Sequence, residues 1–128
     1  MVGSTAAWNK ARAAIEQTYD GTCSVYVYGS ITDPTTHITK KGETCLFEDL
    51  PCRISYRNND LNMSRTTATA SQAVQTIKLF TSPDNAIPKG SKIVVTQNGV
   101  TQAYKSSGEP MMFNTHQEII LELFEKWV

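Results

Sequence analysis

The chain has 128 residues, of which 40% are hydrophobic and 19% charged, a composition typical of one globular domain with a single core. Its twelve basic and twelve acidic side chains cancel, so no whole-molecule field would draw it to nucleic acid or to an anionic membrane surface. No run of about 18 apolar residues occurs, and the first residues lack the charged-then-apolar order of a signal peptide. We therefore expect one domain over residues 1–128, made in the cytoplasm, with no membrane partner.

A short helix is predicted over residues 4–20. Ser4 or Thr5 can cap its start, and Asp20-Gly21 can end it. Larger side chains recur along it at 3.6-residue spacing: Trp8, Ala11 or Arg12, Ile15 and Tyr19. One narrow stripe of this kind predicts a helix that touches the domain along a single face.

Residues 22–56 predict the first strands, because the period changes to two after the helix. Cys23, Val25 and Val27 alternate with Ser24, Tyr26 and Tyr28. Asp33-Pro34 then signals a turn within "GSITDPTTHITKKG". The stretches "ETCLFEDL" and "CRISY" read as two short strands separated by Pro51, which cannot donate to a ladder.

A long polar run, "RNNDLNMSRTTATASQ", occupies residues 57–72. It has few large apolar side chains and neither Pro nor Gly to shape a turn. Loops longer than about 12–15 residues are uncommon in compact domains and are usually functional or disordered. We expect a flexible loop here, since its composition cannot offset the entropy of ordering.

The remaining strands are predicted over residues 73–128 and include a hairpin over 91–106. Asn98-Gly99 is the strongest short hairpin signal, because a type I′ turn needs positive φ at both central residues. Pairing Gln97 with Val100 places Ile93 opposite Tyr104 on the core face.

The last segment, residues 115–127, fits two structures. As a strand it places Gln117, Ile119, Leu121 and Leu123 on one face; as a helix it groups Ile119, Ile120, Leu123, Phe124 and Trp127. The strand is favoured because the preceding sequence is β throughout. The resulting fold class is mainly β, a small antiparallel barrel or sandwich of six to seven strands with one N-terminal helix.

No residues are predicted to carry catalysis, to bind a metal or to hold a cofactor. Glycine-rich phosphate-binding motifs are absent, and His37 and His116 lie far apart in sequence, each in or beside an expected turn. Cys23, Cys45 and Cys52 are odd in number and form no C-x-x-C pair, so reduced, buried thiols are expected. An oligonucleotide-binding barrel remains an alternative, with Tyr26, Tyr28 and Tyr56 beside Arg53 and Arg57 as its stacking face.

The stretch "IPKGSKIVVTQNGVTQAYKSSGEPMMFNTHQEIILELF", residues 87–124, resembles the C-terminal half of head-closure, or stopper, proteins of long-tailed bacteriophages and prophages of Gram-positive bacteria. The resemblance lies in the order of a Pro-x-Gly turn, a hairpin with Asn-Gly at its tip, a "YKSSGEP" bend and a "THQEI" strand. "YDGTCSVYVY" and "PCRISY" are similar to the same family, so most of the chain is covered. These motifs are structural.

The resemblance implies a β-barrel that assembles as a ring, six-fold by expectation, in the neck of the virion, after a cytoplasmic stage in the host. Its implied partners are other copies of itself, the portal and adaptor rings, tail or tail-terminator proteins, and packaged double-stranded DNA in the channel. Tail-terminator and tail-completion rings share this architecture and remain alternatives.

The resemblance also implies that the long loop closes the DNA channel. The matching residues are Arg57, Asn58, Asn59, Asp60, Leu61, Asn62, Met63, Ser64, Arg65, Thr66 and Thr67. Large aromatic residues are candidates for the interfaces, since aromatics are enriched there: Trp8, Tyr26, Tyr28 and Trp127.

Overall fold

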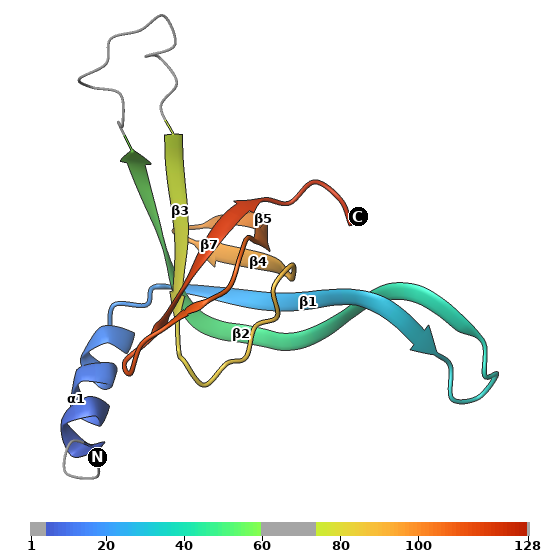
Figure 1. Ribbon diagram of the computed structural model, residues 1–128, viewed down its shortest axis with the longest axis horizontal. Helices are drawn as coiled ribbons and strands as arrows, with labels where there is room; N and C mark the ends of the chain where they lie inside the picture. Colours follow the sequence, from blue (N-terminus) through green and yellow to red (C-terminus); the bar gives the residue numbers. More distant parts are fainter. Residues whose placement is uncertain (1–4, 60–73, 128) are drawn as a thin grey trace, which may run out of the picture.

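The computed structural model describes residues 5–59 and 74–127 (Figure 1). Within them lie one helix and seven strands, with these bounds: α1 Thr5–Glu16, β1 Gly21–Thr32, β2 Thr39–Asn59, β3 Val74–Thr81, β4 Lys92–Gln97, β5 Val100–Ser106, β6 Met111–Met112 and β7 Gln117–Leu123. Most of the expected flexible loop, from Asp60 onward, lies outside the described residues. Its first three residues, Arg57, Asn58 and Asn59, instead continue β2, where they pair with β3.

The strands form a closed antiparallel barrel. Neighbours follow the order β3-β2-β1-β4-β5-β7, and β3 also pairs with β7, which closes the ring of six; the two-residue β6 adds to β7. Closure satisfies the strand edges inside the ring. The expectation of a mainly β, antiparallel barrel with one N-terminal helix is confirmed.

Inward-facing side chains of alternating strand positions fill the barrel. The largest fully buried apolar side chains are Leu79, Ile93, Ile119, Val25 and Val95. They come from four different strands, so the core forms only when distant parts of the chain meet.

The β4–β5 hairpin has the expected register. Gln97 pairs with Val100 and Ile93 with Tyr104, and both Ile93 and Tyr104 are buried. Asn98 has φ 55° and Gly99 has φ 77°, as a type I′ turn requires. The two-residue turn therefore sets which face of β4 and β5 enters the core.

Replacing Gly99 with valine is expected to lower the free energy of unfolding by about 1–2 kcal/mol, because a β-branched residue resists positive φ. Gly29→Val is the matched control: Gly29 lies in β1 without positive φ, and a Cβ there meets nothing within 4 Å. Chemical denaturation of both variants makes the comparison. Equal stability of Gly99→Val and the unsubstituted chain would contradict the turn assignment.

The C-terminal segment is a strand over Gln117–Leu123, as favoured. Gln117, Ile119 and Leu121 are buried, but Leu123 is 60% exposed because β7 runs past the end of the core there. The helical alternative for this segment is wrong, since β7 pairs with both β3 and β5.

The expected pair of short strands before the polar run is a single long strand, β2. It passes through Pro51, which pairs with Thr22 of β1. β3 joins β2 only from Cys52 onward, so a residue without an N–H is tolerated where one side of the strand is unpaired. Two register irregularities, beside Val25, bend β2 against β1.

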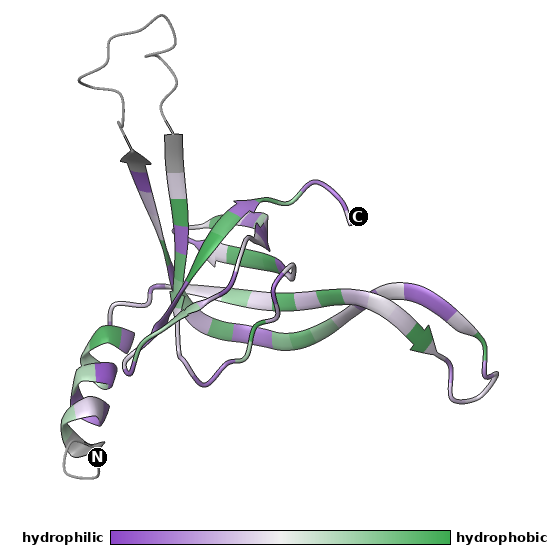
Figure 2. Ribbon diagram, viewed as in Figure 1, coloured by the Kyte–Doolittle hydropathy of each residue, from purple (hydrophilic) through white to green (hydrophobic). Residues whose placement is uncertain are grey.

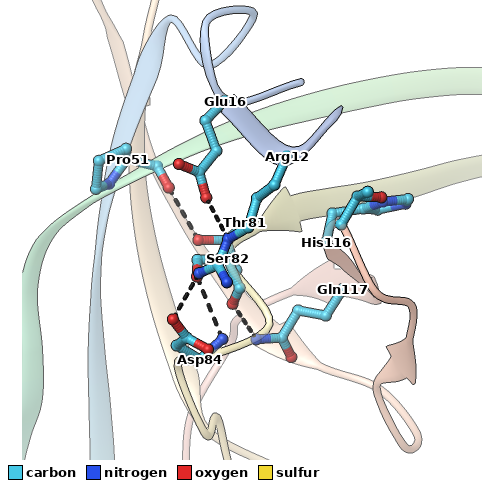
Figure 3. A network of polar contacts seen from close by, with 9 residues as sticks. Arg12, Glu16, Pro51, Thr81, Ser82, Asp84, His116 and Gln117 are labelled. Carbon is cyan, nitrogen blue, oxygen red and sulfur yellow. Dashed lines mark hydrogen bonds and ion pairs between the residues drawn. The ribbon is translucent and has the colours of Figure 1, made fainter. Parts of the chain in front are cut away.

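The helix α1 is held to the barrel largely by polar contacts (Figure 3). The Arg12 guanidinium donates to Glu16 Oε2 at 3.0 Å, to Asp84 Oδ2 at 2.6 Å and to the Ser82 hydroxyl. Arg12, Ile15 and Tyr19 of the expected stripe are half-buried, whereas Trp8 is 43% exposed. The helix therefore docks through its second half.

The three thiols are free, but only two are buried. A hydrogen bond with Cys52 and burial together raise the pKa of Cys23, which keeps it protonated. Cys45 is exposed, so the expectation that all three are buried is wrong for it. It pairs with Tyr26 on the outer face of the sheet.

Candidate functional site

Two strands project from the barrel as an arm, which we define as residues 27–32 of β1 and 39–45 of β2 (Figure 1). The pairing of β1 with β4 ends at Tyr26, and the pairing of β2 with β3 begins only at Cys52. In the described part of the chain, both outer edges of the arm are therefore unpaired. Isolated two-stranded ribbons are marginal in water and open edges attract further strands, so the arm is a candidate assembly surface.

Figure 2 shows hydrophobic positions at the base and at the far end of β1 in the arm, whereas the outer part of β2 is hydrophilic. Tyr28 and Ile31 on β1 are 43% and 37% exposed. Asp33 organises the tip: its Oδ1 accepts from the Thr35 N–H at 2.7 Å.

The C-terminal tail packs on the base of the arm. The Trp127 ring stacks on Tyr28 with centroids 5.2 Å apart and meets the Phe124 ring edge-on at 5.1 Å. We call these three residues the aromatic cluster. Lys92 Nζ lies 5.4 Å from the Tyr26 ring centroid and 5.1 Å from that of Phe124, within cation–π range.

Glu43 of β2 pairs with Tyr28 of β1 and connects Lys92 to Trp127 through hydrogen bonds. Its Oε2 accepts from Lys92 Nζ at 2.8 Å and from Trp127 Nε1 at 3.0 Å. These two hydrogen bonds hold the pKa of Glu43 below its ordinary value of 4.5. A lowered carboxylate pKa means that the contact contributes at neutral pH and is lost as pH falls through that pKa.

Acidification through the lowered pKa of Glu43 is therefore expected to release the tail from the arm. In a Trp8→Phe background Trp127 is the sole tryptophan, and its fluorescence should shift to the red, while far-UV circular dichroism reports an intact barrel. Glu43→Gln in the same background should remove the pH step. A fluorescence maximum that stays constant between pH 7 and pH 3, with the barrel folded, would contradict the assignment.

A second projection, the β2–β3 ribbon, extends from the barrel by antiparallel pairs from Cys52 with Thr81 to Asn59 with Val74. In Figure 1 it rises beyond the other strands. Tyr56 on it is 56% exposed and shares a 3.0 Å hydroxyl contact with Tyr104. Its described part reaches Asn59 and Val74. Residues Asp60 to Thr67 of the expected channel-closing loop lie outside the described residues.

The structure brings together three of the four expected interface aromatics. Tyr26, Tyr28 and Trp127 meet at the base of the arm. Trp8 lies on α1, exposed and apart from them. Asn98 and Gly99 are exposed at the tip of the β4–β5 hairpin.

The aromatic face of the oligonucleotide-binding alternative is split. Tyr28 belongs to the arm and Tyr26 lies at its base, whereas Tyr56 of the β2–β3 ribbon bonds to Tyr104 of β5. Arg53 lines a different hollow, together with Ile15 of α1.

Sequence reasoning missed the environment of His116. Its ring stacks on Phe113 at 4.8 Å, and its Nε2 lies 2.9 Å from Glu118 Oε2, while Glu118 Oε1 accepts from Lys78 Nζ at 3.3 Å. Burial disfavours the charged form of Glu118, but these hydrogen bonds outweigh it and lower its pKa. The alternation along β7, which puts His116 and Glu118 on one face, was the available signal.

His37, by contrast, lies exposed at the tip of the arm with φ 60°. Among residues 5–59 and 74–127, no group of three or more His, Cys, Asp or Glu side chains could hold a metal ion. The described helix is neither long nor apolar enough to cross a membrane.

No protein-family model and no curated protein sequence matches the chain. Among solved structures, it is similar to that of the phage-like element PBSX protein xkdH from Bacillus subtilis. The two share 11% identity with a TM-score of 0.48, over 80% of this chain and 91% of that one. At that distance the similarity carries no conclusion about function.

Proposed function

We propose that the chain is a structural component of a phage particle, and that it acts in the head-to-tail connector. There it forms a ring below the portal and adaptor, closes the DNA exit channel after packaging, and offers a docking surface to the tail. The proposal rests on the sequence resemblance over residues 87–124 and on the architecture of the barrel.

The observation that carries the proposal is the β2–β3 ribbon. The resemblance assigns channel closure to the run that follows "CRISY", and β2 extends without interruption beyond that point to Asn59. Beyond the pair of Tyr56 with Ile77, β2 and β3 pair only with each other in the described part of the chain. The end of the ribbon therefore lies away from the core residues Ile54 and Leu79. A segment that starts there could reach a ring axis while the barrel stays packed against its neighbours.

The open-edged arm supports the same proposal. A ring component needs surfaces that are incomplete in the single chain, and both edges of the arm are unpaired in the described residues.

Assembly without this chain tests the proposal. Heads made in its absence are expected to fill with DNA, to lose it, and to remain without tails. Heads that keep their DNA while tails are malformed would instead favour a tail-terminator or tail-completion ring. Normal infectious particles would contradict a connector role.

A further inference from the structure

A basic groove of about 320 Å³ lies along the free edge of β1, where the arm leaves the barrel. The side chains that define it are Val27, Tyr28, Lys89, Lys105, Lys126 and Trp127. Three of these are lysines, and no acidic residue lines the groove. It therefore presents positive charge beside unpaired strand backbone.

The three lysines keep their charge free for a partner. None of them forms an ion pair among the described residues. The ion pairs found there join carboxylates to Arg12, Lys78, Lys92 and His116. Glu122 lies opposite Lys105 across the β5–β7 pair, but no ion pair joins them. Uncompensated cations around a concave site favour an anionic occupant.

A complementary acidic surface lies on the outer edge of β2, next to the base of the arm. Glu48 and Asp49 are exposed, form no ion pair in the described part of the chain, and follow the 44% exposed Leu46. We call residues 46–49 the acidic edge. Phe47 pairs with Val25, whereas Tyr28 of the groove pairs with Glu43, so the acidic edge lies on the opposite side of the two strands, a few residues closer to the barrel than the basic groove.

We propose that the acidic edge of one copy of this chain docks in the basic groove of the next. Glu48 and Asp49 then face Lys89, Lys105 and Lys126, and the free edge of β2 lies beside the free edge of β1. The two strands would run antiparallel, because β1 and β2 already do so within each arm. Such a contact joins two different surfaces, so it repeats around a ring; it rests on the proposed function and specifies the contact between subunits.

The geometry favours a polypeptide over a nucleic acid as the occupant. Base stacking needs free aromatic faces, but Tyr28 and Trp127 stack on each other and Phe124 closes the side of the cluster. A free strand edge offers alternating N–H and C=O groups, which another strand satisfies by addition to the sheet.

Zero-length carbodiimide cross-linking tests the contact, because it joins only carboxylates and amines that touch. Equal amounts of ¹⁴N- and ¹⁵N-labelled chain are cross-linked at high concentration and low salt, and peptides of mixed label identify links between copies. The expected links join Glu48 or Asp49 to Lys89, Lys105 or Lys126. Glu48→Gln with Asp49→Asn removes the reacting carboxylates and so verifies the assignment of the linked peptides, whereas Asp33→Asn, at the exposed tip, should leave their yield unchanged.

Other results would overturn the contact. Absence of mixed-label links, or links only at other residues, contradicts it; so does protection of the three lysines by a single-stranded oligonucleotide in place of a second copy. Rings joined through other residues would leave the proposed function standing and remove only this interface. A second readout is Cys45, the exposed thiol on β2: its maleimide labelling should slow at least several-fold as chain concentration rises, and a constant rate would count against the contact.

Discussion

Filled heads that carry the chain without residues 61–66 are expected to release most of their DNA. The resemblance assigns channel closure to this run, and the β2–β3 ribbon that carries it is held by its own pairing from Cys52 to Asn59. Shortening the run therefore should leave the barrel folded while the opening at the ring axis widens. DNA retention after nuclease treatment, with circular dichroism of the free chain as the folding check, measures both.

The matched control shortens a different projection. Replacing residues 33–38, the exposed tip of the arm, with Asn-Gly keeps a two-residue hairpin turn and should leave DNA retention unchanged. Heads that retain their genome without residues 61–66 would contradict the channel-closing assignment. Loss of DNA from both variants would show that shortening any projection suffices.

Gln117→Leu is expected to lower the free energy of unfolding by about 2–4 kcal/mol, since two carbonyls of half-buried residues lose their donor and an acceptor left unpaired away from water costs about 1–3 kcal/mol. Gln117 is 1% exposed, and its Nε2 donates to the carbonyls of Ser82 at 2.7 Å and Asn85 at 2.6 Å (Figure 3). Leucine fills a similar volume but satisfies neither carbonyl. The same β3–β4 connection holds Arg12 of α1 through Ser82 and Asp84, so the helix should loosen as well.

Gln102→Leu is the control for this substitution. Gln102 is exposed on β5, where its side chain bonds only to the neighbouring Ala103 carbonyl at 3.3 Å, and its replacement should change stability by no more than about 0.5 kcal/mol. Urea denaturation gives both values. Similar stabilities for the two variants would mean that the β3–β4 connection does not depend on Gln117.

The parts of the fold that local sequence determines were predictable. Asn98-Gly99 sets the register of its hairpin through two residues that accept positive φ. The β-rich sequence before it favoured a strand for β7, and the face expected to carry Gln117, Ile119 and Leu121 is buried.

The continuity of β2 was not predictable from local signals, because Pro51 normally marks a strand end. Whether Pro51 ends the strand depends on which neighbouring strands pair with it, and the pairing of β2 with β3 begins only at Cys52. Cys45 shows a similar limit: apolar surroundings suggested burial, but it lies seven residues before Cys52, so strand alternation places the two on opposite faces.

The sequence indicated several aromatic residues of the candidate site, but not that they lie together. Tyr28 and Trp127 are 99 positions apart in the printed sequence, and only the barrel brings their rings to 5.2 Å. The basic groove joins lysines from the β3–β4 connection, β5 and the C-terminal tail. No periodicity within one element encodes such a surface, because it depends on the tertiary arrangement.

Electron cryo-microscopy of the neck of assembled particles tests the connector role most directly. The proposal predicts a ring of this chain between the adaptor and the tail, with the β2–β3 ribbons of all copies directed toward the channel axis. A ring at the tail tube, a ribbon directed outward, or absence of the chain from the neck would contradict it.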